Sequence, residues 1–103
     1  MSEEKIIVQI DPELEDLIPG FMINRQSDIE LITKAMEKAD YATVERIGHI
    51  LKGAGGGYGF AGISEIGRMM EEAARNKNCQ IILENLEKLK QYLKRVEIKF
   101  ERK

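Results

Sequence analysis

The spacing of apolar residues divides the chain into one extended segment followed by a series of helices. Ile6, Val8 and Ile10 alternate with other residues, which predicts an extended arm or edge strand within residues 1–10. Beyond this arm, apolar residues recur every three or four positions, the period of an amphipathic helix. The pattern predicts a short helix and four bundle helices over these ranges: 11–19, and about 21–38, 40–58, 62–76 and 78–98.

Capping residues and helix breakers support these boundaries. Asp11 followed by Pro12 is typical of a helix start, and Pro19-Gly20 is expected to interrupt the short helix. Asp40 and Asn78 are expected to cap the second and fourth bundle helices. Within residues 21–38, Ser27-x-x-Glu30 resembles a capping box, so a break there is an alternative. A continuous helix is favoured because no glycine or proline intervenes.

The apolar seam of the last two helices indicates a packed bundle. Its members are Ile63, Ile66, Met70 and Ala73 in the third, and Ile82, Leu86, Leu89, Leu93, Val96 and Phe100 in the fourth. The chain end allows two interpretations, because Val96, Ile98 and Phe100 also alternate. Residues 96–103 therefore either continue the last helix or pair with the N-terminal arm.

Composition narrows the class of protein. The chain has 103 residues, enough for one domain with a core, and its 16 basic and 18 acidic residues give a net charge of −2. This balance disfavours a nucleic-acid partner. With one cysteine and one histidine, neither an internal disulfide nor a zinc set is expected. No apolar run reaches about 20 residues and Met1–Lys5 does not resemble a signal peptide, so we expect a cytoplasmic protein without a membrane span.

Five glycines lie between Gly53 and Gly59, and they have more than one interpretation. Gly57-x-Gly59-x-x-Gly62 matches a dinucleotide fingerprint, but a helical pattern rather than a strand precedes it. A flexible loop is the stronger alternative, because glycine inside a helix costs about 1 kcal/mol relative to alanine. Tyr58 nevertheless keeps the helical phase of the preceding apolar residues, which favours a helix through about Gly57.

His49, the only histidine, is predicted to lie on the outer side of its helix. Val44, Ile47 and Leu51 cluster on the opposite side. Lys52 follows by three positions and is therefore a surface neighbour of His49. A titratable nucleophile is thus expected beside an ammonium group and bare backbone at Gly53 and Gly56. This arrangement fits a docking site for a phosphoryl group that arrives from a partner protein.

The segment His49-x-Leu51-Lys52-Gly53, with Gly59 ten residues after the histidine, resembles the signature of the histidine phosphotransfer (HPt) domain of bacterial two-component phosphorelays. Asp11–Phe21 and Tyr58–Ala74 extend the resemblance to free-standing single-domain members, over roughly residues 6–98. The resemblance implies an all-α fold, an antiparallel four-helix bundle, here with an extended N-terminal arm and a short extra helix. It also implies that an exposed histidine accepts and donates a phosphoryl group.

The same resemblance implies roles for residues around His49, the phospho-acceptor. Lys52 is expected to offset the charge of the phosphoryl oxygens. Members place a glutamine or glutamate where Glu71 stands, beside the histidine ring, and a carboxylate that accepts from Nδ1–H would leave Nε2 as the nucleophile. The alternative for Glu71 is an ordinary helical pair with Arg75.

Partner docking is expected at Gly53, Gly56, Glu45 and Arg75. The implied partner is the receiver domain of a response regulator, a hybrid sensor histidine kinase, or both, and the receiver is expected to bring the Mg²⁺. The chain itself is then a monomeric phosphoryl carrier without a cofactor or a nucleotide site, not an enzyme. The alternative is a non-catalytic helical module that binds a signalling partner. A kinase dimerisation region is disfavoured, because kinases place an acidic residue where Ile50 follows the histidine.

Overall fold

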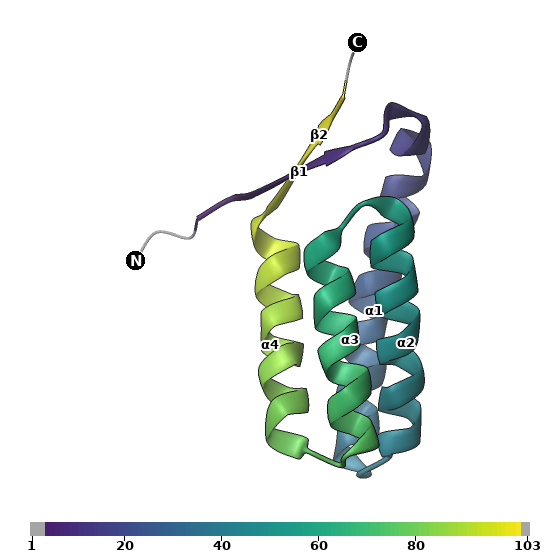
Figure 1. Ribbon diagram of the computed structural model, residues 1–103, viewed down its shortest axis with the longest axis vertical. Coiled ribbons are helices and arrows are strands. Elements are labelled where there is room, and N and C mark those ends of the chain that lie inside the picture. The colour runs from purple at the N-terminus through teal and green to yellow at the C-terminus, as the bar shows by residue number, and fades with distance from the viewer. Residues whose placement is uncertain (1–3, 102–103) are drawn as a thin grey trace.

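The computed structural model describes residues 4–101, so residues 1–3 of the predicted arm and residues 102–103 lie outside it. Four α-helices make up most of the described chain (Figure 1). The elements are β1 (Ile6–Ile10), a 3-10 helix η1 (Pro12–Leu17), α1 (Ile18–Glu37), α2 (Tyr41–Tyr58), α3 (Ala61–Arg75), α4 (Cys79–Arg95) and β2 (Val96–Phe100).

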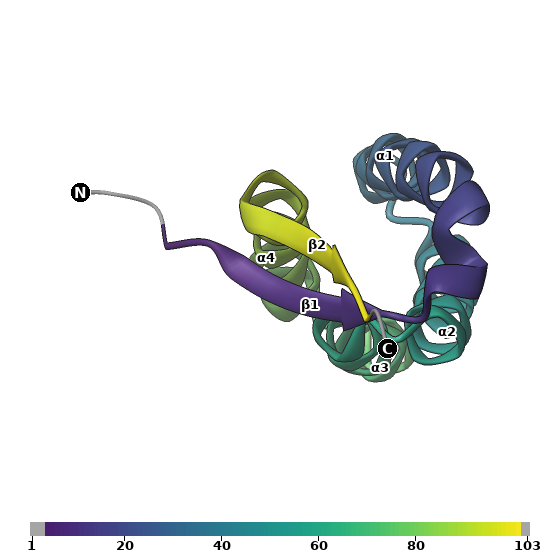
Figure 2. The ribbon, with the colours of Figure 1, turned by 90° about the horizontal axis from the view of Figure 1, so that it is seen from above.

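The helices lie side by side and enclose the apolar core. Viewed from above, α1, α2, α3 and α4 follow one another around an arc, and both strands cross the upper end of the bundle (Figure 2). The most extensive contact joins α2 to α3. The fully buried large side chains include Ile32, Val44, Leu51, Phe60, Ile63, Met70, Ile82 and Leu89. All four helices and the loop before α3 therefore contribute to one core.

Side-chain caps begin two of these helices where the sequence predicts them. Asp40 Oδ1 accepts a hydrogen bond from the Thr43 backbone N–H at 3.2 Å, at the start of α2. Asn78 Oδ1 accepts one from the Ile81 backbone N–H at 3.2 Å, at the start of α4. Each cap satisfies an N–H group that has no partner within its own helix. Both predicted caps are confirmed.

The N-terminal boundary differs from the prediction. Instead of a helix over 11–19 that Pro19 interrupts, a 3-10 helix ends at Leu17 and α1 begins at Ile18, before the predicted start of the 21–38 helix. Pro19 lies in the first turn of α1, where a missing backbone N–H costs nothing because that group would have no helical partner. The helix then continues past Ser27 without a break.

The C-terminal boundary also differs, because the helix predicted over 78–98 ends at Arg95. Val96–Phe100 instead forms β2, which pairs in parallel with β1 in the register Ile6↔Val96 to Ile10↔Phe100. The fold is therefore mainly helical rather than strictly all-α. Strand pairing gives the backbone groups of the N-terminal arm partners that a longer helix would not supply.

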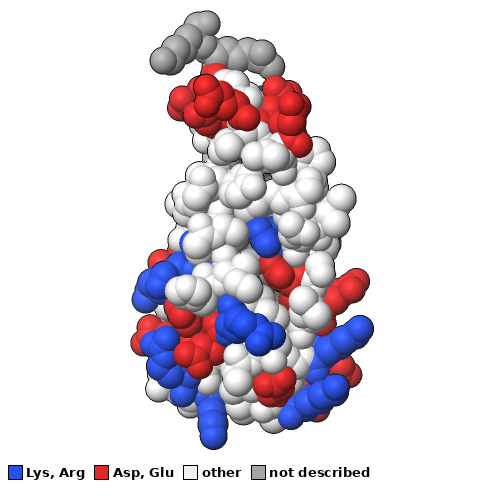
Figure 3. Space-filling view, turned by 90° about the vertical axis from the view of Figure 1, so that its right-hand side faces the viewer, with Lys and Arg blue, Asp and Glu red and all other residues white. Residues whose placement is uncertain are grey.

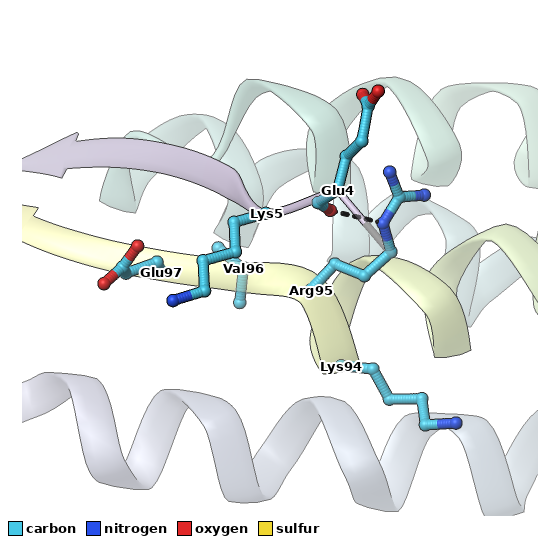
Figure 4. A pocket seen from close by; sticks show the side chains of 6 residues that line it. All are labelled: Glu4, Lys5, Lys94, Arg95, Val96 and Glu97. Carbon is cyan, nitrogen blue, oxygen red and sulfur yellow. Dashed lines mark hydrogen bonds between the residues drawn. The ribbon is translucent and has the colours of Figure 1, made fainter. Parts of the chain in front are cut away.

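A hydrogen bond holds the two strands where they meet the bundle. The Arg95 Nε donates to the Glu4 carbonyl oxygen at 2.6 Å, where α4 passes into β2 (Figure 4). At the other end of the sheet, Ile10 is 1% exposed and belongs to the core. The arm is thus attached both by backbone pairing and by one buried side chain.

We expect Ile10→Ala to lower the free energy of unfolding by about 2–5 kcal/mol, because it removes a buried side chain and leaves a cavity. Ile7→Ala is the matched control, since Ile7 lies on the same strand but is 61% exposed. That control should change stability by less than about 0.5 kcal/mol. Urea unfolding followed by circular dichroism measures both, and equal losses would contradict the role of Ile10.

Candidate functional site

His49 lies in the middle of α2 with its imidazole in solvent. Its side chain is 69% exposed, whereas Val44, Ile47 and Leu51 on the same helix are buried in the core. The predicted opposition between His49 and this apolar stripe is confirmed. A partner protein can therefore reach the ring without opening the bundle.

Glu71 on α3 contacts the ring of His49. Its Oε2 lies 2.9 Å from His49 Nδ1, although 22 positions separate the two residues in the sequence. Arg75 also approaches the same carboxylate, with Nη2 at 3.7 Å from Oε2. Both interpretations of Glu71 that the sequence left open thus describe real contacts. The contact with His49 is the shorter, and it has hydrogen-bond geometry.

The ionisation of Glu71 determines which ring nitrogen is free. Burial raises the pKa of this carboxyl group, whose side chain is 14% exposed, but the hydrogen bond from His49 and the charge of Lys52 outweigh burial and lower the pKa overall. Glu71 is therefore an anion at neutral pH and can only accept a hydrogen bond. Nδ1 of His49 must then carry the proton, and the neutral ring keeps a lone pair on Nε2.

Lys52 completes the group of charges beside the ring. Its Nζ lies 3.5 Å from Oε1 of Glu71, so the two carboxylate oxygens have different partners. The Lys52 side chain is 45% exposed, and it stands one helical turn after His49. The ammonium group is therefore a partly exposed neighbour of the His49 ring.

Glu45 and Arg75 form an ion pair next to His49, Glu71 and Lys52. Arg75 Nε donates to Glu45 Oε2 at 3.3 Å, which links α3 to α2. The side chains of Arg75 and Glu45 are 61% and 39% exposed, so solvent and salt screen the pair. Glu45 lies one turn before His49. The structure thus brings both predicted docking residues close to His49.

The glycine-rich segment belongs to α2, which continues through Tyr58. The loop alternative is therefore wrong, and the left-handed residue that ends the helix is Gly59, with φ of 91°. A Cβ atom added at Gly53 would meet nothing within 4 Å, and one at Gly56 would only touch Ser64 Oγ at 3.7 Å. The surface next to His49 is thus flat and open at these two residues.

Sequence reasoning did not identify Gly48, Gly67 and Ser64, three residues that join α2 to α3. Gly48 and Gly67 are both buried where the two helices cross, and Ser64 Oγ donates to the Lys52 carbonyl oxygen at 2.9 Å. The sequence signal for Gly48 and Gly67 is a glycine among the apolar residues that face the core, which indicates a close approach between helices. The sequence also did not indicate that Ile50, next to His49, is 47% exposed.

Charge is distributed unevenly over the face that α1 and α2 present. Figure 3 shows acidic side chains near its upper end, side chains of both signs near its lower end, and few charges between them. Gly53, Gly56 and Gly57 on α2 contribute no side chains, and all three are exposed. An uncharged area of this kind suits close contact with another protein.

Within residues 4–101, no group of three or more His, Cys, Asp or Glu side chains is placed to hold a metal ion. None of the helices in that range is both long enough and apolar enough to cross a membrane.

Comparison with known families identifies the class of protein. The family model of the Hpt domain matches residues 16–98, which is most of the chain. The protein therefore belongs to the Hpt domain family, as the resemblance predicted. No curated protein and no solved structure matches the chain. Hpt domains are phosphocarrier modules of two-component signalling that interact with receiver domains and kinases, and they are not enzymes in the usual sense.

We expect Gly53→Gln to stabilise the fold by about 0.5 kcal/mol, because Gly53 is exposed within a helix and glutamine is a better helix former. The new side chain should also project beside His49 and slow phosphotransfer about tenfold, which corresponds to about 1.4 kcal/mol at the docked state.

Gly20→Gln on α1 is the control, since a Cβ atom there also meets nothing within 4 Å. It should leave transfer unchanged. Thermal unfolding and single-turnover transfer on both variants check the prediction, and normal transfer by Gly53→Gln would refute the docking role of Gly53.

Proposed function

We propose that this protein is a phosphorelay intermediate in which His49 accepts a phosphoryl group from a phospho-aspartate of a receiver domain, or from a histidine kinase, and passes it to another receiver aspartate. The observation that carries the proposal is the contact between an exposed histidine ring and a largely buried, ionised Glu71. This contact leaves one ring nitrogen with a free lone pair pointing away from Glu71.

The chemical step needs no proton to leave the histidine. Nε2 of neutral His49 attacks the phosphorus in line, the N–P bond forms, and the P–O bond to the aspartyl carboxyl group breaks. The leaving group is the aspartate carboxylate, and the ring, which keeps its proton on Nδ1, becomes cationic. The reverse step returns the phosphoryl group to an aspartate. Acyl phosphates and phosphohistidine are both high-energy species, so the transfer can run in either direction.

Glu71 and Lys52 support this step through charge. The positive charge that develops on the ring lies against the Glu71 carboxylate, which already accepts from Nδ1 at 2.9 Å. The interaction is thus stronger in the transition state than before reaction, which is the condition for catalysis. The Lys52 ammonium, 3.5 Å from the same carboxylate, is close enough to move toward the phosphoryl oxygens as a point charge.

Docking of the receiver uses the open backbone beside His49. Gly53 and Gly56 let the receiver surface approach α2, and Glu45 and Arg75 offer charges at the edge of the contact. The receiver domain supplies the Mg²⁺ and most of the stabilisation of the transferring group. This protein contributes the nucleophile, its orientation and the charges of Lys52 and Glu71.

We expect the protein, mixed with a phosphorylated partner receiver domain, to gain an acid-labile, base-stable phosphate, as a phosphoramidate does. His49→Gln should abolish this label because it removes the nucleophile, and it should leave the helical circular dichroism signal intact because the side chain is exposed. Radiolabelled transfer followed by gel electrophoresis measures the label. A label that survives the substitution would mean that another residue is the acceptor.

A second substitution of the same residue, His49→Ala, separates phosphotransfer from a purely structural role. If the protein is a non-catalytic interaction module, His49→Ala should retain full biological activity. Loss of signalling together with loss of the label supports the phosphorelay.

We expect Glu71→Ala to slow transfer about tenfold, by analogy with the loss of about 10–100-fold that follows removal of the partner that orients a metal-ligating histidine. Glu71→Gln should slow transfer less, because its amide oxygen can still accept from Nδ1–H. Glu72→Ala is the matched control on the same helix, since Glu72 is 62% exposed and pairs with Arg68 rather than His49. Equal rates for all three variants in single-turnover assays would reduce Glu71 to a salt-bridge partner.

A further inference from the structure

The side chains that form the site belong to two helices whose backbones touch. His49 and Lys52 are on α2, and Glu71 is on α3. The contact between Glu71 and His49 therefore depends on the distance between the helix axes. Two buried glycines, Gly48 and Gly67, lie at the backbone contact next to these residues.

Gly67 on α3 packs directly against the backbone of α2. A Cβ atom at this position would lie 2.4 Å from the Lys52 backbone nitrogen and 2.7 Å from the Gly48 carbonyl oxygen. Non-bonded carbon atoms normally lie about 3.5–4.0 Å from their neighbours. Any side chain at Gly67 would therefore force the two backbones apart.

Gly48 makes the corresponding contact from α2. A Cβ atom there would lie 2.7 Å from the backbone nitrogen and 3.0 Å from the Cα of Glu71. Gly67 thus packs on Lys52, one helical turn after Gly48, and Gly48 packs on Glu71, one helical turn after Gly67. Those two residues, Lys52 and Glu71, are the ones whose side chains meet at 3.5 Å beside His49.

We propose that Gly48 and Gly67 are positioning residues for phosphotransfer: their missing side chains bring the backbones of Lys52 and Glu71 close enough for Glu71 to hold the His49 ring. The expected effect of these glycines on the transfer rate rests on the proposed function. Their expected effect on the orientation and tautomer of the His49 ring does not.

The magnitude of the displacement supports this role. To relieve a 2.4 Å contact, the helices must separate by about 1 Å before normal contact is reached. With unchanged side-chain rotamers, a displacement of that size would stretch the His49–Glu71 contact of 2.9 Å beyond the range of about 2.7–3.2 Å in which N–H···O hydrogen bonds form. The neutral ring would lose the partner that keeps the proton on Nδ1.

Gly62 on the same helix provides a contrast. A Cβ atom there would meet the ring of Tyr92 on α4, with the nearest atom at 2.4 Å. Gly62→Ala should therefore disturb the packing of α3 against α4 and leave the α2–α3 crossing in place. It is a matched control for a general loss of stability.

The test is a double-mutant cycle on transfer rate. Gly67→Ala, Glu71→Ala and the double variant are compared with the unmodified protein, using a receiver domain phosphorylated by acetyl phosphate. We expect each single variant to slow transfer about tenfold, and the double variant to be no slower than Glu71→Ala alone. Gly62→Ala should lower the melting temperature but transfer at the normal rate. Gly48→Ala provides a second cycle if Gly67→Ala does not fold.

Nitrogen-15 NMR of the imidazole, without any phosphoryl donor, tests the positioning separately. In Gly67→Ala the neutral ring should shift toward the Nε2–H tautomer, whereas in Gly62→Ala it should remain Nδ1–H. An unchanged tautomer in Gly67→Ala would overturn the inference. So would a transfer rate in the double variant that is reduced by the product of the two single-variant factors. Absence of a phosphohistidine in the unmodified protein would instead refute the proposed function and leave the NMR result standing.

Discussion

The close backbone contact between α2 and α3 is the constraint on which the arrangement of the site depends. Gly48 and Gly67 are buried at this crossing, and Ser64 Oγ adds a hydrogen bond to the Lys52 carbonyl oxygen at 2.9 Å. Glycine in a helix interior is unfavourable by about 1 kcal/mol relative to alanine. The two buried glycines thus reduce the intrinsic stability of their helices. In return, they allow the backbones of α2 and α3 to pack closer together.

The charge balance around Glu71 follows from this geometry. A carboxylate whose side chain is 14% exposed is destabilised by burial, but the hydrogen bond with His49 and the nearby Lys52 reverse the effect on its pKa. The group therefore stays ionised although it is largely covered. An acceptor-only partner at Nδ1 selects the ring tautomer, while 69% exposure of the His49 side chain keeps the ring accessible. The Nδ1 side of the His49 ring is thus held by Glu71, while the rest of the ring remains accessible to a partner.

Local signals in the sequence were sufficient for the histidine helix but not for contacts between distant segments. Asp40, Tyr58 and the Val44 stripe define α2 through interactions within a few residues of each other, so its bounds and the exposure of His49 could be predicted. Whether Glu71 reaches His49 depends instead on the axis separation of two helices. No local pattern determines that distance, so the sequence alone does not decide between the two contacts of Glu71.

The chain end illustrates the same limit. The spacing of Val96, Ile98 and Phe100 fits both a continued helix and a strand. The strand forms because these residues pair with β1, which lies at the opposite end of the sequence. The start of α1 has a local explanation instead. The helix begins at Ile18, three residues before the predicted start at 21, because Pro19 lies in its first turn, where proline is compatible with a helix.

The site of attachment on the imidazole tests the central claim most directly. The account requires that the Glu71 contact occupies Nδ1 and that the phosphoryl group is carried by Nε2. After transfer from a phosphorylated receiver domain, ³¹P and ¹⁵N NMR of the labelled protein distinguish the two isomers of phosphohistidine. We expect a phosphorus coupled to Nε2, with the proton retained on Nδ1. A phosphoryl group on Nδ1 of His49 would contradict the account, because that nitrogen could not then donate to Glu71.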